Sequence, residues 1–244
     1  MLTQYRLTLS PDRPCHPRPE WGYRLYAALL EAAPASFGAG VHEDAVTPVS
    51  QFLTVRDDSL LWTVSLLGGE SENALGPVLE RAASFPLQKD GVVLSVRDRR
   101  TRTVPDVDAL LARGAASGGI HRLRFCTATA FKSRGRYLNL PTGRLIVQSL
   151  IKKWNGCFPE CPIEDDDGEG MEALAAGLRC TRFRLQDRTY YLKGNSIPGF
   201  TGELTLENRL EGFHRQLTSA LLLFSAYAGV GVKTTLGMGG IQIG

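Results

Sequence analysis

The pattern of apolar and polar positions predicts alternating strands and helices in the first half of the chain. Apolar residues alternate loosely with polar ones over 2–9, as on a half-buried strand, and recur at helical spacing over 20–33. The series continues with strands at 49–56 and 60–67, a helix at 71–84 and a strand at 91–97, which runs into a basic turn at 97–102. The order strand, helix, strand, strand, helix, strand is typical of a ferredoxin-like domain.

The second half repeats this order in an elaborated form, after a segment of mixed character at 103–119. Its predicted elements are a strand at 121–131, a helix at 144–154, a strand hairpin formed by 178–185 and 188–193, a strand at 200–207 and a helix at 208–228. The last helix has a core stripe at 3–4 spacing, made of Leu210, Phe213, Leu217, Leu221 and Phe224. We therefore predict an α+β protein of two tandem ferredoxin-like (RRM-like) domains, at 1–110 and 118–244.

A glycine-rich segment follows this helix. Its glycines are at positions 229, 231, 237, 239 and 240, and Lys233 lies between them. Such spacing suits a loop that adopts positive φ and brings a phosphodiester backbone close to its amides. It is not a Walker A loop, because Val232 precedes Lys233 where that motif has glycine, and it holds no complete GxGxxG. The alternative is a plain turn that leads into a last strand at 240–243.

The basic residues are distributed unevenly, although the net charge is only +3. No acidic residue lies between Asp108 and Glu160, or from Gly212 onward. The first of these intervals contains Arg113, Arg122, Arg124, Lys132, Arg134, Arg136, Arg144, Lys152 and Lys153. Such segregation predicts a surface that binds a polyanion, with nucleic acid favoured over a merely solvated basic face.

Composition predicts a cytoplasmic protein. The five cysteines are an odd number without a CxxC motif, and no apolar run reaches the length of a membrane helix. Two metal sites remain as alternatives: zinc at Cys157 and Cys161, and a divalent ion at the acidic run Glu164–Asp167. The cysteine pair lacks nearby histidines and the acidic run lacks a liganding scaffold, so we expect no metal and no cofactor.

Five segments, taken in order, resemble one known family. They are Gly-Val-His42-Glu-Asp-Ala-Val-Thr-Pro, Arg-Phe-Cys-Thr-Ala-Thr-Ala-Phe131-Lys132, the run from Leu140 to Asn155, Pro198-Gly-Phe-Thr-Gly202 and the glycine-rich segment. With the paired ferredoxin-like halves, they resemble the CRISPR repeat-processing endoribonucleases of the RAMP superfamily. The match covers nearly the whole chain.

This resemblance implies metal-independent cleavage of a CRISPR precursor transcript within its repeat, which gives guide RNAs. In the family's reaction the ribose 2′-hydroxyl attacks the adjacent phosphate and leaves a 2′,3′-cyclic phosphate and a 5′-hydroxyl. Such a reaction needs a base, an acid and positive charge for the phosphorane. His42 occupies the place of the family's catalytic histidine, and an imidazole with a pKa of about 6.5 suits proton transfer.

The resemblance also implies catalytic partners for His42. The resemblance implies a tyrosine from the first helix, which Tyr26 or Tyr23 could supply, although a core position for either is an alternative. The family also has a lysine shortly after the histidine, and this chain departs from that pattern: Glu43–Pro48 contains no cation. Arg24, on the first helix, and Lys132 are candidates to replace it.

RNA binding is expected from the basic second domain and the glycine-rich segment. The candidate residues are Lys132, Arg134, Arg136, Lys152, Lys153, Gly229, Gly231, Lys233, Gly237 and Gly239. Expected partners are repeat RNA and mature guide RNA, while effector-complex subunits and a second copy of the chain stay open. Two rival functions also stay open: a non-catalytic RAMP subunit that binds guide RNA, and a general RNA-recognition module. The latter is ranked last because 121–131 lacks an RNP1-type core.

Overall fold

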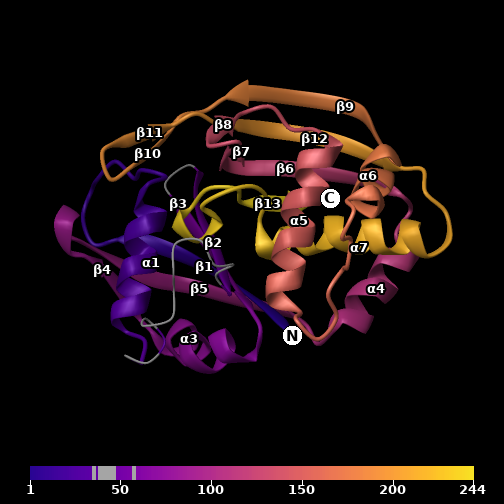
Figure 1. Ribbon diagram of the computed structural model, residues 1–244. Helices are drawn as coiled ribbons and strands as arrows, with labels where there is room; N and C mark the ends of the chain where they lie inside the picture. Colours follow the sequence, from indigo (N-terminus) through magenta and orange to yellow (C-terminus); the bar gives the residue numbers. More distant parts are fainter. Residues whose placement is uncertain (35–36, 38–47, 57–58) are drawn as a thin grey trace.

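The computed structural model describes residues 1–34, 37, 48–56 and 59–244. Two antiparallel sheets lie side by side, one from each half of the chain (Figure 1). The first half contains β1 (Leu2–Pro11), α1 (Trp21–Glu31), β2 (Val49–Arg56), β3 (Ser59–Leu67), α3 (Gly69–Arg81), β4 (Ser84–Leu87), the 3-10 helix η1 (Gln88–Asp90) and β5 (Val92–Val104). Its strand order β2-β3-β1-β5-β4 is the ferredoxin-like order with one added edge strand.

The second half is built in the same way. Its elements are α4 (Val107–Ala116), β6 (Ile120–Thr129), β7 (Phe131–Ser133), β8 (Arg136–Leu138), α5 (Gly143–Cys157), α6 (Glu169–Ala176), β9 (Leu178–Asp187), β10 (Tyr190–Leu192), β11 (Asn195–Ile197), β12 (Phe200–Asn208), α7 (Gly212–Ala228), the 3-10 helix η2 (Thr234–Leu236) and β13 (Ile241–Ile243). The sheet order is β13-β6-β12-β9. The predicted class, α+β with tandem ferredoxin-like domains, is confirmed.

Each sheet buries one face because its side chains alternate. On β1, Leu7 and Leu9 are buried in one cluster with Leu25 of α1 and Leu79 of α3, while Arg6, which precedes Leu7, points to the other face. The two helices thus cover the same face of the first sheet. The opposite face packs against the second half at Leu2, Leu67 and Val104. Farther along the strands the same face carries arginines such as Arg6 and Arg100.

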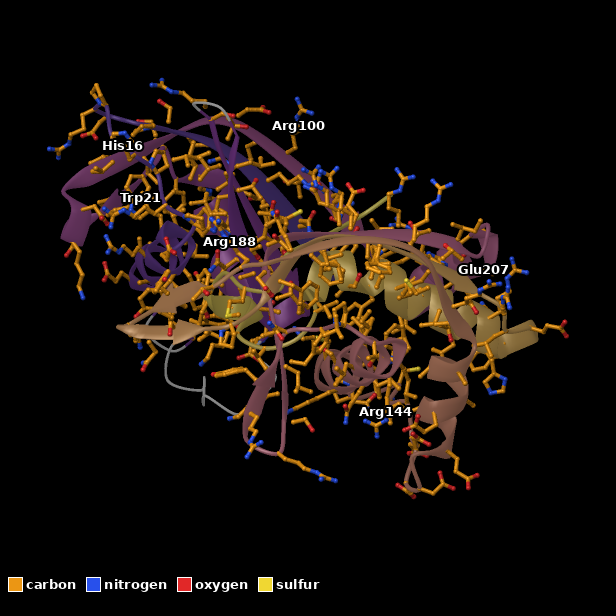
Figure 2. All side chains as sticks on the ribbon, turned by 90° about the horizontal axis from the view of Figure 1, so that it is seen from above. His16, Trp21, Arg100, Arg144, Arg188 and Glu207 are labelled. Atoms are coloured by element: carbon orange, nitrogen blue, oxygen red, sulfur yellow. The ribbon has the colours of Figure 1, made fainter. Side chains whose placement is uncertain are left out.

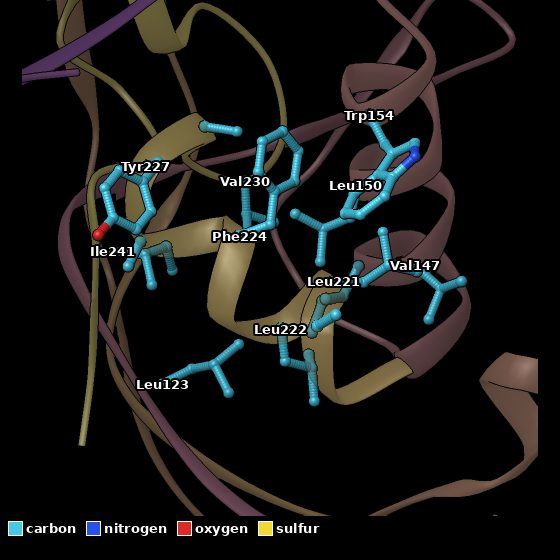
Figure 3. Close-up of a cluster of buried hydrophobic side chains, with 14 of the residues drawn as sticks. Leu123, Val147, Leu150, Trp154, Leu221, Leu222, Phe224, Tyr227, Val230 and Ile241 are labelled. Carbon is cyan, nitrogen blue, oxygen red and sulfur yellow. The ribbon is translucent and has the colours of Figure 1, made fainter. Parts of the chain in front are cut away.

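Helix α7 is apolar nearly all round because it is buried on several sides. Phe224 lies 5.6 Å from Trp154 of α5, ring centroid to centroid, and Leu221 and Leu222 are fully buried (Figure 3). Leu2 and Val104 of the first sheet belong to the same core cluster. The helix is therefore shared by both halves, which explains a hydrophobic pattern wider than one stripe.

Helix α4 connects the halves. The Asp106 carboxylate caps it by accepting a hydrogen bond from the Ala109 amide at 2.7 Å. Leu110 is buried in the core of the second half, and a Cβ on Gly114 would lie only 2.5 Å from the Gln216 carbonyl oxygen of α7. The predicted end of the first domain, at residue 110, therefore falls inside a helix that packs against the second half.

Two local predictions were wrong. Residues 97–102 form no turn, because β5 continues to Val104 and pairs with β1 from Leu2 to Pro11. The predicted hairpin of 178–185 with 188–193 does not form either. Instead β9 pairs with β12, and β10 forms a short hairpin with β11. Turn residues at both places favoured a local reversal, but pairing with distant strands satisfies more backbone hydrogen bonds.

Candidate active site and nucleic-acid interface

The three residues predicted on α1 lie in different surroundings. Tyr26 is buried in the core, its hydroxyl has no partner among the described residues, and burial raises its pKa to about 12. Arg24 is ion-paired with Asp90 of η1. Tyr23 is half-buried, and the ammonium of Lys193 lies 5.4 Å from its ring centroid. Tyr23 therefore faces the second half, while Tyr26 is buried in the core of the first half and Arg24 is ion-paired there.

His42 lies outside the described residues, so its place in the site stays a prediction. The described histidines have other surroundings. His16 is exposed in the loop before α1, and His214 is exposed on α7. His121 is buried on β6 with Nε2 3.1 Å from Ser219 Oγ, and burial lowers its pKa. This burial and hydrogen bond indicate a structural role for His121.

The β10–β11 hairpin brings the second half onto α1 (Figure 1). The Tyr190 hydroxyl donates to the Leu236 carbonyl of η2 at 2.6 Å, which ties the hairpin to the glycine-rich segment. A small core holds this junction together: buried Leu192 and Met238 belong to it, and Tyr23 packs against it. Tyr137 of β8 also packs there, so both hairpins of the second half, the glycine-rich segment and α1 meet at one place.

The glycine-rich segment uses positive φ as predicted. Gly229, Gly231, Gly237 and Gly239 all have positive φ, and Lys233 does so as well, at 55°. Close packing makes glycine necessary at two of these positions. A Cβ on Gly231 would lie 2.2 Å from the Ala130 carbonyl oxygen, and one on Gly239 would lie 2.1 Å from that of Val230. The loop is therefore folded tightly against the protein.

Several amides of this loop are already occupied. The Gly229 amide donates to the Ser225 carbonyl at 2.8 Å and the Gly239 amide to the Ala128 carbonyl at 3.0 Å. The Gly231 amide donates to Ser149 Oγ at 2.8 Å. These contacts contradict the prediction that these three amides hold a phosphodiester backbone, because each N–H already donates a hydrogen bond within the protein. The phosphate-binding roles of Gly237 and Lys233 stay predictions.

The same loop joins the two halves. Gln51 of β2 donates from Nε2 to the Thr235 carbonyl at 2.9 Å, and Thr235 Oγ1 donates back to the Val49 carbonyl at 3.2 Å. Gln4 of β1 donates to the Ala226 carbonyl at the end of α7 at 2.7 Å. In the described structure the loop and the end of α7 thus connect the two halves at the junction.

Lys153 supports the loop from the other side. Its ammonium donates to the Ala228 carbonyl at 2.9 Å and to Thr234 Oγ1 at 2.8 Å. Burial lowers its pKa to about 7, with Cys157 and Lys152 as weaker influences. We therefore correct the prediction that Lys153 contacts phosphate: its side chain is committed to α7 and the loop.

The buried Lys153 predicts a pH-dependent stability. Its pKa is depressed in the folded state, so the unfolded chain binds this proton more tightly between pH 7 and about 10. The free energy of unfolding should rise with pH in that window, by up to about 1.4 kcal/mol per unit. Urea titrations across the window should show the rise in wild type and in Lys152→Met, which alters an exposed neighbour, but not in Lys153→Met. Equal slopes in all three proteins would contradict the assignment.

Exposed cations lie on the β7–β8 hairpin and on α5. Lys132, Arg134 and Arg136 are exposed on the β7–β8 hairpin, whose tip has positive φ at Arg134 and at Gly135. Lys152 is exposed on α5. None of these four side chains pairs with a carboxylate in the described part of the chain. Their charge is therefore available to a polyanion, and their contact with RNA stays a prediction.

Sequence reasoning counted Arg122 and Arg124 in a basic interval but did not identify the second basic surface to which they belong. Alternating arginines occupy the outer faces of both sheets: Arg6, Arg100 and Arg102 in the first, and Arg122, Arg124, Arg182 and Arg184 in the second. Figure 2 shows Arg100 on the opposite side of the molecule from Arg144 of α5. The i, i+2 spacing of these arginines was the available signal, because it places each pair on one face of a strand.

A groove of about 940 Å³ runs between the two outer faces. Thr54 of β2 and Leu61 of β3 line its first wall, and Arg124, Arg184 and Gln242 lie on the other. Its acidic side chains are Glu20 and Glu203, and Glu203 is the cross-strand neighbour of Arg124 and Arg184. A groove with charged and small polar walls suits an extended polyanion better than a compact apolar ligand.

The metal alternatives gain no support. Asp165 accepts hydrogen bonds from the amides of Gly170 and Met171, at the start of α6. Cys157 and Cys161 are free thiols, as are the other three cysteines. In the part of the chain that the structure describes, no three His, Cys, Asp or Glu side chains gather as a metal centre needs. Nor does any described helix have the length and apolar character needed to cross a membrane.

Comparisons with known proteins agree on one family. The model of the family CRISPR-associated endoribonuclease Cas6 matches residues 123–241. A CRISPR-associated endoribonuclease Cas6 of Mycobacterium tuberculosis is 30% identical over 248 residues, with 99% of this chain and 78% of that protein covered. One of Streptococcus thermophilus is 27% identical, with 98% and 97% covered.

A solved structure agrees with these relatives. It is a Cas6 product complex with a TM-score of 0.76 and 22% identity, aligned over 100% of this chain and 99% of that one. At this identity the likeness supports the fold, while the Mycobacterium relative establishes the family. The chain therefore belongs to the Cas6 family of CRISPR-associated endoribonucleases.

Proposed function

We propose that this protein cleaves CRISPR precursor RNA within the repeat and so produces guide RNAs. The observation that carries the proposal is the junction at Tyr23, where α1 meets both hairpins of the second half and the glycine-rich loop. Free cations on the β7–β8 hairpin border this junction. A hydroxyl beside basic side chains at the meeting point of two ferredoxin-like halves suits the handling of a phosphodiester.

The proposed chemistry is an internal transesterification. The ribose 2′-oxygen forms a bond to the adjacent phosphorus, the bond from phosphorus to the 5′-oxygen breaks, and a 2′,3′-cyclic phosphate and a 5′-hydroxyl result. Because the nucleophile belongs to the substrate, no water has to be activated, and proton transfer by side chains suffices without a metal ion. His42 is our candidate for one proton transfer.

Tyr23 is a better partner for His42 than Tyr26. The hydroxyl of Tyr26 is buried in the core, and desolvation raises its pKa to about 12, which disfavours loss of its proton. Tyr23 is half-buried and faces the second half. Arg24 is less suitable than predicted because Asp90 already neutralises it.

RNA is proposed to contact the two basic surfaces. The β7–β8 hairpin, with Lys132, Arg134 and Arg136, offers three unpaired cations near the junction. The groove between the sheets offers a path for unpaired nucleotides past Arg124 and Arg184. Affinity should therefore fall steeply with salt, since each phosphate contact releases counterions.

A non-catalytic RNA-binding subunit is the second candidate. One observation favours it: the segment after His42 reads Glu43-Asp44 and has no cation before Pro48. Such a protein would bind the same RNA through the same cations and leave it intact.

Cleavage in chelator tests the proposal. Purified protein is incubated in EDTA with repeat RNA from its own genome, and with the same RNA carrying one 2′-deoxynucleotide at the cleavage position. We expect a single cut in the all-ribose RNA, a cyclic phosphate by mass spectrometry, and no cut in the deoxy substrate. Tight binding without any cut would favour the second candidate, and a cut that requires added metal would refute the proposed chemistry.

A further inference from the structure

The proposed chemistry lacks an obvious source of positive charge for the phosphorane. Two negative charges develop on its non-bridging oxygens, and a positioned cation there lowers the barrier. The segment Glu43–Pro48 supplies no lysine or arginine. Arg24, on α1 beside Tyr23, is ion-paired with Asp90. Neither of these two groups of the first half fills the role, and the other candidate predicted from sequence, Lys132, lies in the second half.

Lys193 reaches α1 from the second half. It lies at the tip of the β10–β11 hairpin, between Leu192 and Asn195, and its ammonium is 5.4 Å from the ring centroid of Tyr23. Figure 1 shows this hairpin beside α1. Among the cation–aromatic contacts of the described residues, this is the one that involves α1.

The position of Lys193 is fixed by its hairpin. Lys193 has φ 49° and is followed by Gly194 at φ 82°, which gives the two-residue turn of a tight hairpin. Leu192 before the turn and Ile197 after it are buried at 7% and 3% exposure. Tyr190 anchors the base of the hairpin through its bond to Leu236. The backbone that carries the ammonium is thus held on both sides of an exposed tip.

The charge of Lys193 is available to a substrate. Its side chain is exposed, and it pairs with no carboxylate among the described residues. An exposed cation–aromatic contact contributes only about 0.5–1 kcal/mol. A charge-assisted hydrogen bond to a phosphate oxygen is stronger. The ammonium can therefore leave the face of the Tyr23 ring and bind a phosphate placed beside it, since breaking the cation–aromatic contact takes little free energy.

We propose that Lys193 supplies the positive charge that stabilises the phosphorane, in place of a lysine after His42. The ammonium keeps its proton and donates a hydrogen bond to a non-bridging oxygen, while the proton transfers to and from the bridging oxygens belong to other groups. This inference rests on the proposed function. It makes the catalytic site a composite, with the hydroxyl group from the first half and the cation from the second.

Single-turnover cleavage at saturating protein tests the proposal. Loss of one donor of this kind lowers a rate constant by about 10²–10³-fold. We expect that loss for Lys193→Ala and Lys193→Gln, with the dissociation constant for uncleaved 2′-deoxy RNA changed by less than about threefold, as for the loss of one surface cation. Lys193→Arg should recover part of the rate. The control is Lys89→Ala, which removes an exposed lysine of η1 and should cut like wild type.

A phosphorothioate substrate separates contact with the phosphate from a structural effect. Sulfur at the non-bridging position that Lys193 contacts should lower the cleavage rate constant of wild type. In Lys193→Ala the rate constant should be the same for the sulfur and the oxygen substrate. Equal slowing of both proteins by either sulfur isomer would overturn the proposal, as would an unchanged rate constant in Lys193→Ala. If wild type cuts and requires His42 but not Lys193, this inference fails alone. If wild type does not cut, the proposed function fails with it.

Discussion

Replacement of His42 by alanine is expected to lower the rate constant for repeat-RNA cleavage by about 10²–10⁴-fold. The reason is the loss of a group that exchanges a proton near neutral pH, since an unperturbed imidazole has a pKa of about 6.5. Affinity for RNA should stay within about threefold of wild type, because a neutral histidine brings no positive charge to neutralise a phosphate of the RNA. The measurement is single-turnover cleavage in EDTA, with binding to the 2′-deoxy substrate determined in parallel.

His214→Ala is the matched control. This histidine is exposed on α7, away from the residues assigned to the site, so its loss should leave both cleavage and binding unchanged. Cleavage that survives in His42→Ala would keep the proposed reaction but remove His42 from it. His16→Ala would then be the next variant to measure, because His16 is the exposed histidine that precedes α1 in the chain.

The second large effect is expected from Gly231→Ala. Gly231 has φ 79°, and an added Cβ would lie 2.2 Å from the backbone oxygen of Ala130. The contacted atom belongs to the backbone and not to a flexible side chain, so the loop has to shift and lose bonds such as that from the Gly231 amide to Ser149. We expect the free energy of unfolding to fall by about 3 kcal/mol, in the range of a strained backbone combined with a lost buried hydrogen bond.

Urea denaturation measures this loss, and Gly118→Ala provides the comparison. A Cβ on Gly118 would meet no atom within 4 Å, and its φ is not positive. That variant should be as stable as wild type or slightly more so, because alanine restricts the unfolded chain. If Gly231→Ala were equally stable, the loop would not be the tightly packed joint described above.

The fold could be predicted because the sequence shows both the 3–4 spacing of buried helix positions and the alternation of half-buried strands. Leu217, Leu221 and Phe224 of the predicted stripe are buried on α7, whereas Phe213 is 60% exposed and Leu210 precedes the helix. Alternation identified β1 and β6. Partner choice was harder to predict. Local pattern does not say which strand a segment joins, and β9 pairs with a strand that begins after the intervening β10–β11 hairpin. The β5 arginines looked like a turn because most side chains there are exposed on both faces.

The candidate site shows the same limit at the level of side chains. Sequence placed Tyr23, Arg24 and Tyr26 on one helix but could not assign their directions. Those directions are set by distant residues, Asp90 in one case and Lys193 in another. Positive φ in the glycine-rich loop was predictable from residue type, whereas the occupation of its amides depends on Ala128 and Ser149. The sequence therefore predicted backbone conformation at these positions but not which distant residues each group contacts.

The bonds from the end of α7 to β1, and from the glycine-rich loop to β2, bear on how the protein is made. Residues 226–240 are synthesised long after the first sheet, yet the Ala226 and Thr235 carbonyls accept hydrogen bonds from Gln4 and Gln51. The first half can collapse early on the ribosome, since its core cluster is its own. The junction at Tyr23 can form only when the loop has emerged. A nascent chain can therefore carry a folded first half before the junction exists, and the proposed site is completed only after the loop has emerged.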